Sequence, residues 1–176
     1  MVEMSRNKVF LLGFMGCGKS TLGRHLAKAL GWEFIDLDDY FEQKFKTTVP
    51  LFFKEFGETG FRDGERAALQ DLKSVDEAVI ATGGGAPCYF DNMDFMNEHG
   101  VTLYMKVSPE ILAQRLTNSK NVRPLVQGKT GAELITYIKE KLKSREPFYN
   151  RANIIADAEV LDLSGYLRVL EGIGIT

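Results

Sequence analysis

Short apolar runs recur along the chain and are separated by longer segments of mixed polarity. The runs cover residues 9–12, 34–35, 78–81, 101–105 and 154–155. The first, third and fourth runs show no alternation of polar and apolar residues, which is typical of strands buried on both faces. The pattern therefore predicts a parallel sheet built from these short strands.

Between the runs, apolar residues recur at the spacing of one helix face. Two sets follow four-residue steps: Leu22, Leu26 and Leu30, and later Leu134, Ile138 and Leu142. Ser108 and Pro109 mark another helix start, because these residue types favour the N-cap and the first turn. Strands that alternate with helices indicate βαβ units, so the predicted fold class is α/β.

Two segments interrupt this alternation. Residues 38–65 are rich in phenylalanine and too long for a plain connection, so we expect a helical substrate-binding insertion there. Residues 115–128 are polar, locally basic and contain Pro124 and Gly128, which favours a mobile lid over a site. An ordinary surface loop has the same composition, so both interpretations of residues 115–128 stay open.

Composition narrows the class of protein further. The 176 residues amount to one domain, spanning residues 1–176, and Lys plus Arg number 22 against 24 Asp plus Glu. This balance gives no sign of a nucleic-acid partner, and no apolar run approaches the roughly 20 residues that span a membrane. The two cysteines are too few for a disulfide framework or a zinc site, so we expect a cytoplasmic protein.

Residues 13–20, GFMGCGKS, match the P-loop pattern G-x-x-x-x-G-K-[ST]. Its glycines allow backbone N–H groups to surround phosphate, Lys19 adds a positive charge, and the Ser20 hydroxyl can bind Mg²⁺. A strand is predicted before the loop and a helix after it, as a true P-loop requires. The expected nucleotide contacts are Gly16, Cys17, Gly18, Lys19, Ser20 and Thr21.

Two carboxylates follow the second apolar run, where an open α/β sheet binds its ligands. Asp36 could hold Mg²⁺, and Asp38 could bind a substrate hydroxyl and accept its proton. An aspartate at the end of a strand is equally typical of the N-cap of the next helix. Both interpretations stay open for each residue.

A triple glycine at residues 83–85 follows the third apolar run, where backbone N–H groups can approach a ligand closely. Arg62, Arg123 and Arg145 each stand beside an aromatic residue or a proline, and their planar guanidinium groups suit carboxylate or phosphate. Taken singly, a flexible turn and solvated surface arginines explain these features as well.

In order, the P-loop, D-x-D, GFR, GGG, RPL and R-x-P-x-Y motifs resemble the shikimate kinase family from about residue 8 to about residue 153. The resemblance implies a nucleoside-monophosphate-kinase-like, three-layer P-loop fold around a five-stranded parallel sheet. It also implies a monomer that uses ATP and Mg²⁺ to phosphorylate the 3-hydroxyl of shikimate in aromatic amino acid biosynthesis.

The same resemblance assigns roles to individual residues. Ser20 and Asp36 would hold Mg²⁺, and Phe53 and Phe61 would pack against the ring of the substrate. Shikimate would be bound by Asp38, Arg62, Gly83, Gly84, Gly85 and Arg145. The catalytic residues would be Lys19, Asp38 and Arg123, the last of which would also contact the nucleotide.

Three alternatives remain at the level of the sequence, one of which is a nucleoside monophosphate kinase. A gluconate-type kinase would share the P-loop and the lid. A nucleotide-binding switch would also share the P-loop, but a guanine-specific one would need an N-K-x-D element late in the sheet, and the Asn-Lys pair of this chain, Asn7 and Lys8, precedes the first predicted strand. The chain also departs from the family at Leu116, where some members place an arginine over adenine, although Arg115 is adjacent and could replace it.

Overall fold

The structure is a computed structural model that describes residues 7–120 and 126–176. Its strands are β1 (Lys8–Leu12), β2 (Glu33–Asp36), β3 (Ala78–Ala81), β4 (Val101–Lys106) and β5 (Ile154–Asp157). They form one sheet in the order β2-β3-β1-β4-β5, and every pair is parallel. Each strand contains one of the predicted apolar runs wholly or in large part, so the α/β prediction is confirmed.

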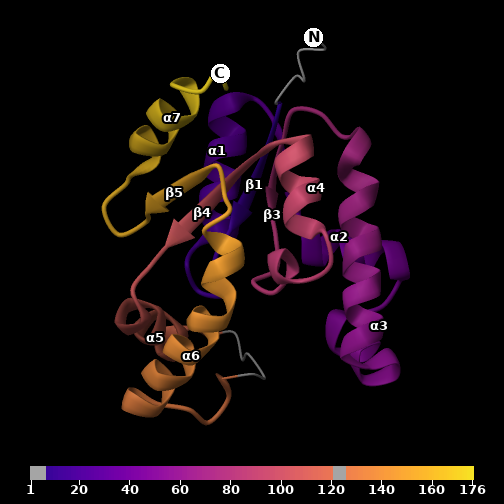
Figure 1. The fold of residues 1–176 in the computed structure, drawn as a ribbon, viewed down its shortest axis with the longest axis vertical. Coiled ribbons are helices and arrows are strands. Elements are labelled where there is room, and N and C mark those ends of the chain that lie inside the picture. The colour runs from indigo at the N-terminus through magenta and orange to yellow at the C-terminus, as the bar shows by residue number, and fades with distance from the viewer. Residues whose placement is uncertain (1–6, 121–125) are drawn as a thin grey trace.

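Helices lie on both faces of the sheet, which gives three layers (Figure 1). The α-helices are α1 (Lys19–Leu30), α2 (Leu37–Phe45), α3 (Val49–Asp71), α4 (Asn92–His99), α5 (Pro109–Asn118), α6 (Gly131–Tyr149) and α7 (Leu163–Glu171). Two short 3-10 helices, η1 (Leu72–Ser74) and η2 (Ala86–Cys88), complete the described elements. None of the helices in residues 7–120 and 126–176 is long and apolar enough to cross a membrane.

The central strand β1 shows how the sequence builds the core. All five of its residues are buried, and successive side chains point to opposite faces. Val9 and Leu11 pack with residues of α1, α5, α6 and α7, whereas Phe10 and Leu12 pack with residues of α2, α3 and α4. A strand covered on both faces needs apolar residues at every position, which is why the run lacks alternation.

The two segments that interrupt the predicted alternation are placed as follows. Most of residues 38–65 form α2 and the first part of α3, which bends at Gly57, so this segment is helical as expected. Residues 115–118 form the last turn of α5 rather than a loop. Residues 121–125, including Arg123, lie outside the described residues.

Parallel pairing brings the carboxyl ends of the strands to one edge of the sheet. The P-loop leaves β1 at this edge, α2 leaves β2, and the triple glycine leaves β3. Because these three strands are neighbours, motifs that are far apart in the sequence converge on one place.

Gly23→Ala is expected to lower the free energy of unfolding by about 1 kcal/mol. A β-carbon at this buried helical position would lie 2.4 Å from Phe34 Cε2 and 3.3 Å from Leu11 Cδ1. Overpacking costs about 1–3 kcal/mol, and the better helix propensity of alanine returns up to about 1 kcal/mol. Thermal unfolding followed by circular dichroism measures the difference.

Gly172→Ala is the matched control for this prediction. The nearest atoms to a β-carbon at Gly172 lie at ordinary contact distances of 3.4 and 3.5 Å. Its φ is −60°, which any residue adopts. The packing argument is wrong if Gly23→Ala unfolds at the same temperature as the wild type and as Gly172→Ala.

Candidate active site

The loop between β1 and α1 has the backbone shape of an anion-binding cradle. Gly13, Gly16 and Gly18 have φ angles of 148°, 83° and 99°, values that favour glycine. Gly18 is the N-cap of α1, and no side chain of the described residues caps that helix end. The N–H groups of the first turn therefore remain for an anion, and the helix dipole adds to its attraction.

Lys19 begins α1, and its side chain folds back over this loop. Its Nζ donates to the carbonyl oxygens of Gly13 at 2.6 Å and Phe14 at 3.1 Å. It also lies 3.7 Å from Cys17 Sγ, and Cys17 is only 2% exposed beneath the loop. The ammonium group is thus held beside the N–H groups that would surround a phosphate.

The two carboxylate oxygens of Asp36 have different partners, one in the cap of α2 and one in the P-loop helix. Oδ1 caps α2 by accepting from the N–H groups of Asp38 at 3.0 Å and Asp39 at 3.4 Å. Oδ2 accepts from the Ser20 hydroxyl at 2.9 Å. Both interpretations of Asp36 are therefore compatible, because capping occupies one oxygen and leaves the other beside Ser20.

Ser20 and Asp36 together have the chemistry that Mg²⁺ requires. This ion prefers oxygen ligands and is commonly held by one or two carboxylates together with substrate phosphates and water. In the described part of the chain, no cluster of three or more His, Cys, Asp or Glu side chains offers a metal site. The hydroxyl–carboxylate pair beside the phosphate cradle fits a nucleotide-bound Mg²⁺.

A cavity of about 540 Å³ joins the P-loop to the ends of β2 and β3. The predicted residues that line it are Gly16, Gly18, Lys19, Ser20, Thr21, Asp36, Asp38, Gly83 and Gly84. A groove of about 620 Å³ beside β5 and α6 contains none of the predicted residues. The cavity at the P-loop is therefore the one that the sequence motifs assemble.

Asp38 occupies the first turn of α2 and faces this cavity. A β-carbon on Gly83 would lie 3.5 Å from Asp38 Oδ1, so the carboxylate lies next to the triple glycine. Asp38 keeps access to solvent, but the cavity walls displace much of the surrounding water. This desolvation, and then the negative charge of Asp36, raise the pKa of Asp38, although Lys19 opposes the shift.

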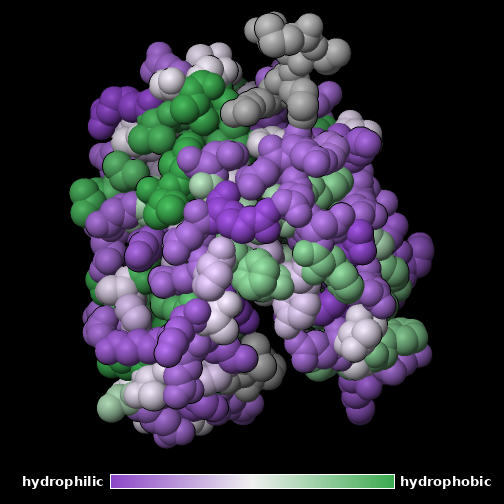
Figure 2. Space-filling model, in the orientation of Figure 1, coloured by the Kyte–Doolittle hydropathy of each residue, from purple (hydrophilic) through white to green (hydrophobic). Residues whose placement is uncertain are grey.

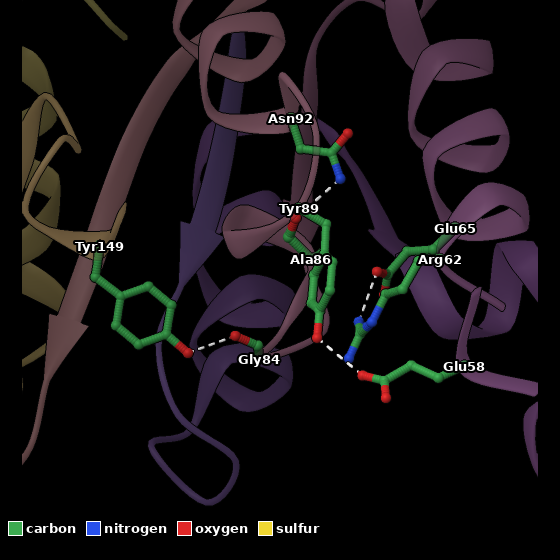
Figure 3. A network of polar contacts seen from close by, with 8 residues as sticks. All are labelled: Glu58, Arg62, Glu65, Gly84, Ala86, Tyr89, Asn92 and Tyr149. Atoms are coloured by element: carbon green, nitrogen blue, oxygen red, sulfur yellow. Dashed lines mark hydrogen bonds and ion pairs between the residues drawn. The ribbon is translucent and has the colours of Figure 1, made fainter. Parts of the chain in front are cut away.

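Arg62, on α3, lies against the triple glycine from one side (Figure 3). A β-carbon on Gly85 would lie 2.5 Å from Arg62 Nη2, so only glycine permits this approach. The guanidinium stacks on the Tyr89 ring at 4.1 Å and pairs through Nη1 with Glu65 at 2.8 Å. Its Nε is buried without a hydrogen-bond partner in the described part of the chain.

Arg145, on α6, reaches the same turn from another element. A β-carbon on Gly84 would lie 3.1 Å from Arg145 Nη1. That Nη1 is buried and makes no hydrogen bond within residues 7–120 and 126–176. Two guanidinium groups with unused donors thus meet at one glycine turn, where they can bind a carboxylate.

Glu65 is a site residue that the motifs did not single out. It is 2% exposed, holds Arg62 in place, and would lie 3.2 Å from a β-carbon on Gly83. Burial raises its pKa despite the neighbouring charge of Arg62. The signal was the spacing, since residues three apart on a helix face the same side and Glu65 follows Arg62 at that distance.

The remaining predicted residues are placed as follows. Arg115 Nη1 donates to the carbonyl oxygens of Gly16 at 3.3 Å and Cys17 at 3.2 Å, and Leu116 lines the cavity beside it. Phe61 is buried in the core, and Phe53 packs on it with ring centroids 5.8 Å apart. The assignments of Arg123 to catalysis and of Phe53 and Phe61 to a substrate ring stay predictions.

Comparison with known proteins shows the family to which the chain belongs. The family model described as "SKI: Shikimate kinase" matches residues 15–164. A shikimate kinase of Parabacteroides distasonis is 50% identical over 152 residues, which cover 86% of this chain and 88% of that protein.

Two solved structures agree with this result. The crystal structure of shikimate kinase from Bacteroides thetaiotaomicron is 44% identical, with a TM-score of 0.88 over 94% of this chain and 97% of that one. The shikimate kinase of Acinetobacter baumannii in complex with shikimate is 34% identical, with a TM-score of 0.84 over 98% of this chain and 97% of that one. The chain therefore belongs to the shikimate kinase family.

Proposed function

We propose that this chain transfers the γ-phosphoryl group of ATP to the 3-hydroxyl of shikimate, giving ADP and shikimate 3-phosphate for aromatic amino acid biosynthesis. The observation that carries the proposal is the convergence of Arg62 and Arg145 on the triple glycine, next to Asp38 and the P-loop. The family match favours this reaction over the gluconate-type alternative and over a nucleotide-binding switch.

Shikimate presents one carboxylate and three hydroxyls, and the triple-glycine turn at the edge of the cavity gathers matching groups, although Arg62 and Arg145 lie behind the turn and do not line the cavity itself. Arg62 and Arg145 would bind the carboxylate, because both keep buried donors without partners in the described part of the chain. Asp38 and the N–H groups of residues 83–85 would bind hydroxyls. The reactive hydroxyl would then lie between Asp38 and the phosphate cradle.

On the nucleotide side, the loop N–H groups and Lys19 would bind the β- and γ-phosphates of ATP, and Thr21 would contact the α-phosphate. Ser20 and Asp36 would hold Mg²⁺, which neutralises phosphate charge when it is bound. Arg123 would approach the phosphates from the lid and stabilise the charge that develops during transfer.

The transfer itself needs little covalent chemistry from the protein. The hydroxyl oxygen of the acceptor forms a bond to the γ-phosphorus while the bond from that phosphorus to the β–γ bridging oxygen breaks, and ADP leaves. The proton of the hydroxyl passes to the Asp38 carboxylate. The raised pKa of Asp38 makes it a better proton acceptor than an ordinary aspartate.

Two further points belong to the same proposal. We expect the protein to work as a monomer, because the P-loop, Asp38, Arg62 and Arg145 all come from one chain. We expect it to act in the cytoplasm, where its co-substrate ATP is available.

Ser20→Ala is expected to raise the Mg²⁺ concentration needed for half-maximal rate by about tenfold or more. The substitution removes one of the two side-chain oxygens that fit the metal, and the loss of outer-shell partners alone typically costs about tenfold. Ser20→Thr keeps the hydroxyl and serves as the control. Equal Mg²⁺ dependence in Ser20→Ala and Ser20→Thr would remove Ser20 from the metal site.

An acceptor panel tests the function. ADP release is measured in a coupled assay with ATP, Mg²⁺ and either shikimate, gluconate, a nucleoside monophosphate or no acceptor. Turnover that requires shikimate supports the proposal. ADP release that is indifferent to shikimate, or that depends on gluconate instead, contradicts it.

A further inference from the structure

The triple-glycine turn and the short helix η2 after it are braced by side chains from both sides (Figure 3). The Tyr149 hydroxyl, at the end of α6, donates to the carbonyl oxygen of Gly84. Asn92 Nδ2, at the start of α4, donates to the carbonyl oxygen of Ala86 at 2.8 Å. The turn that would meet the acceptor is therefore not held by its own backbone alone.

Tyr149 is well suited to this bracing role. It is fully buried, with 0% exposure, and its ring packs on Tyr104 with centroids 4.9 Å apart. Burial raises the pKa of its hydroxyl, so the group remains a protonated donor throughout the physiological pH range. A buried hydroxyl needs a hydrogen-bond partner, and here that partner is the Gly84 carbonyl.

Fixing this carbonyl also fixes the N–H group that follows it. The chain has no cis peptide bonds among its described residues, and in a trans peptide the C=O and the next N–H point in opposite directions. Because the Gly84 carbonyl points to Tyr149, the Gly85 N–H points away from α6. Arg62 lies on that opposite side of the turn (Figure 3).

The Gly85 N–H is available for a ligand. Within residues 7–120 and 126–176 it donates to no backbone or side-chain acceptor, whereas the next N–H in the chain, that of Ala86, donates to Gly83. Arg145 stands four residues before Tyr149, so the two side chains leave the same face of α6. Arg145 lies over Gly84, and its distance from the turn depends on how α6 is attached there.

We infer that Tyr149 is a positioning residue for the acceptor site. Its hydroxyl anchors α6 to Gly84, which aims the Gly85 N–H toward the acceptor and sets the separation between Arg145 and the turn. The inference rests on the proposed function, since the acceptor whose binding it supports is the carboxylate-bearing substrate. The hydrogen bond itself includes no atom of Lys19 or of the P-loop, although a β-carbon on Gly84 would lie 3.4 Å from the Gly13 carbonyl oxygen. We therefore expect its loss to act on the binding of shikimate and to leave the binding of the nucleotide near its wild-type strength.

Tyr149→Phe is expected to raise the KM for shikimate about fivefold, the effect of losing one hydrogen bond, and to leave the KM for ATP unchanged. Tyr104→Phe is the matched control, because it removes a neighbouring buried hydroxyl that lies against Glu146 instead of the turn. Tyr104→Phe should keep the wild-type KM for both substrates.

A second variant tests whether the hydrogen-bond donor, and not only the aromatic ring, is needed at position 149. Incorporation of 4-aminophenylalanine at position 149 restores an N–H donor in the same place and should return the KM for shikimate toward the wild-type value. An unchanged KM for shikimate in Tyr149→Phe overturns the inference. It is also overturned if both KM values rise together, or if the aminophenylalanine variant gives no rescue.

One readout is independent of the reaction. The backbone amide resonance of Gly85 should shift in Tyr149→Phe and stay in place in Tyr104→Phe, whatever substrate the protein uses. If the wild-type enzyme fails to use shikimate but this shift occurs, the proposed function fails while the bracing stands. If the Gly85 resonance is unchanged in Tyr149→Phe, the bracing is wrong.

Discussion

Asp38→Asn is expected to lower kcat with shikimate by about a thousandfold, the middle of the range for losing a positioned proton acceptor. The substitution keeps the size and the hydrogen-bonding ability of the side chain but removes the base. The KM for ATP should stay near its wild-type value, because Lys19 and the P-loop form the phosphate cradle without Asp38. Steady-state kinetics with each substrate varied in turn measures both effects.

The same variant should be more stable than the wild type at neutral pH. The pKa of Asp38 is raised in the folded protein above the ordinary 3.8 of an aspartate, which means that folding favours the protonated carboxyl group. The favourable contribution of Asp38 to stability is therefore fully present only below the pKa of the unfolded state. That contribution is lost as the pH rises through the folded pKa, so the ionised carboxylate destabilises the protein at pH 7. Melting temperatures in EDTA should be higher for Asp38→Asn than for the wild type at pH 7.

Asp39→Asn is the matched control for both effects. Asp39 is the next carboxylate in the first turn of α2, it is exposed, and it does not line the cavity. It should retain kcat within about twofold, as expected for a surface substitution that changes free energies by no more than about 0.5 kcal/mol. If Asp38→Asn also keeps most of its kcat, Asp38 orients the hydroxyl without accepting its proton.

Arg62→Ala is expected to raise the KM for shikimate by about a hundredfold. Truncating one partner of a hydrogen-bonded charge pair that is shielded from water costs about 2–5 kcal/mol, and 1.4 kcal/mol corresponds to a factor of ten. The KM for ATP should change little, because Arg62 lies on the side of the triple glycine opposite α6 and outside the P-loop. Initial rates over a wide shikimate range provide the measurement.

Arg62→Ala would also lower the stability of the protein, because the buried carboxylate of Glu65 would lose its ion pair. The double variant Arg62→Ala, Glu65→Gln removes this unpaired charge and should recover stability without recovering the KM. Arg66→Ala is the control, since Arg66 lies one turn further along α3 and pairs with Asp91. A KM for shikimate in Arg62→Ala that equals the value in Arg66→Ala would exclude Arg62 from carboxylate binding.

The fold could be predicted because its signals are local and repeated. The unbroken apolar run at residues 9–12 means burial on both faces, and the structure places alternate residues of β1 in the two halves of the core. The order of the strands across the sheet could not be predicted in this way, because it depends on contacts between distant segments. That order brings β1, β2 and β3 together and so assembles the site.

Site residues could be predicted where their role requires one particular residue type, such as glycine for a special backbone conformation or a charged side chain. The sequence reveals the glycines of the P-loop, because other residues rarely adopt their positive φ angles. It also reveals the glycine that Arg62 approaches closely, because a side chain there would collide with the guanidinium. Glu65 and Tyr149 were missed as site residues because they act through a second group, Arg62 and Gly84 respectively. Neither residue type by itself distinguishes this role from packing.

Polar and apolar side chains gather on different parts of the surface. Figure 2 shows a mostly hydrophilic surface over α3 and α6, with a hollow between the lower parts of the molecule, and an apolar patch near α7 and β5. The exposed apolar residues of that region include Ile155, Val160 and Ile173. They lie on the β5 side of the sheet, whereas the proposed site gathers around the ends of β1, β2 and β3.

Direct identification of the product is the measurement that tests the central claim. The enzyme is incubated with ATP, Mg²⁺ and shikimate, and phosphorus and proton NMR spectra are recorded as the reaction proceeds. We predict one phosphate ester, on the 3-hydroxyl of shikimate, formed in equal amount with ADP. Formation of ADP and inorganic phosphate with shikimate unchanged would contradict the assignment of shikimate as the acceptor.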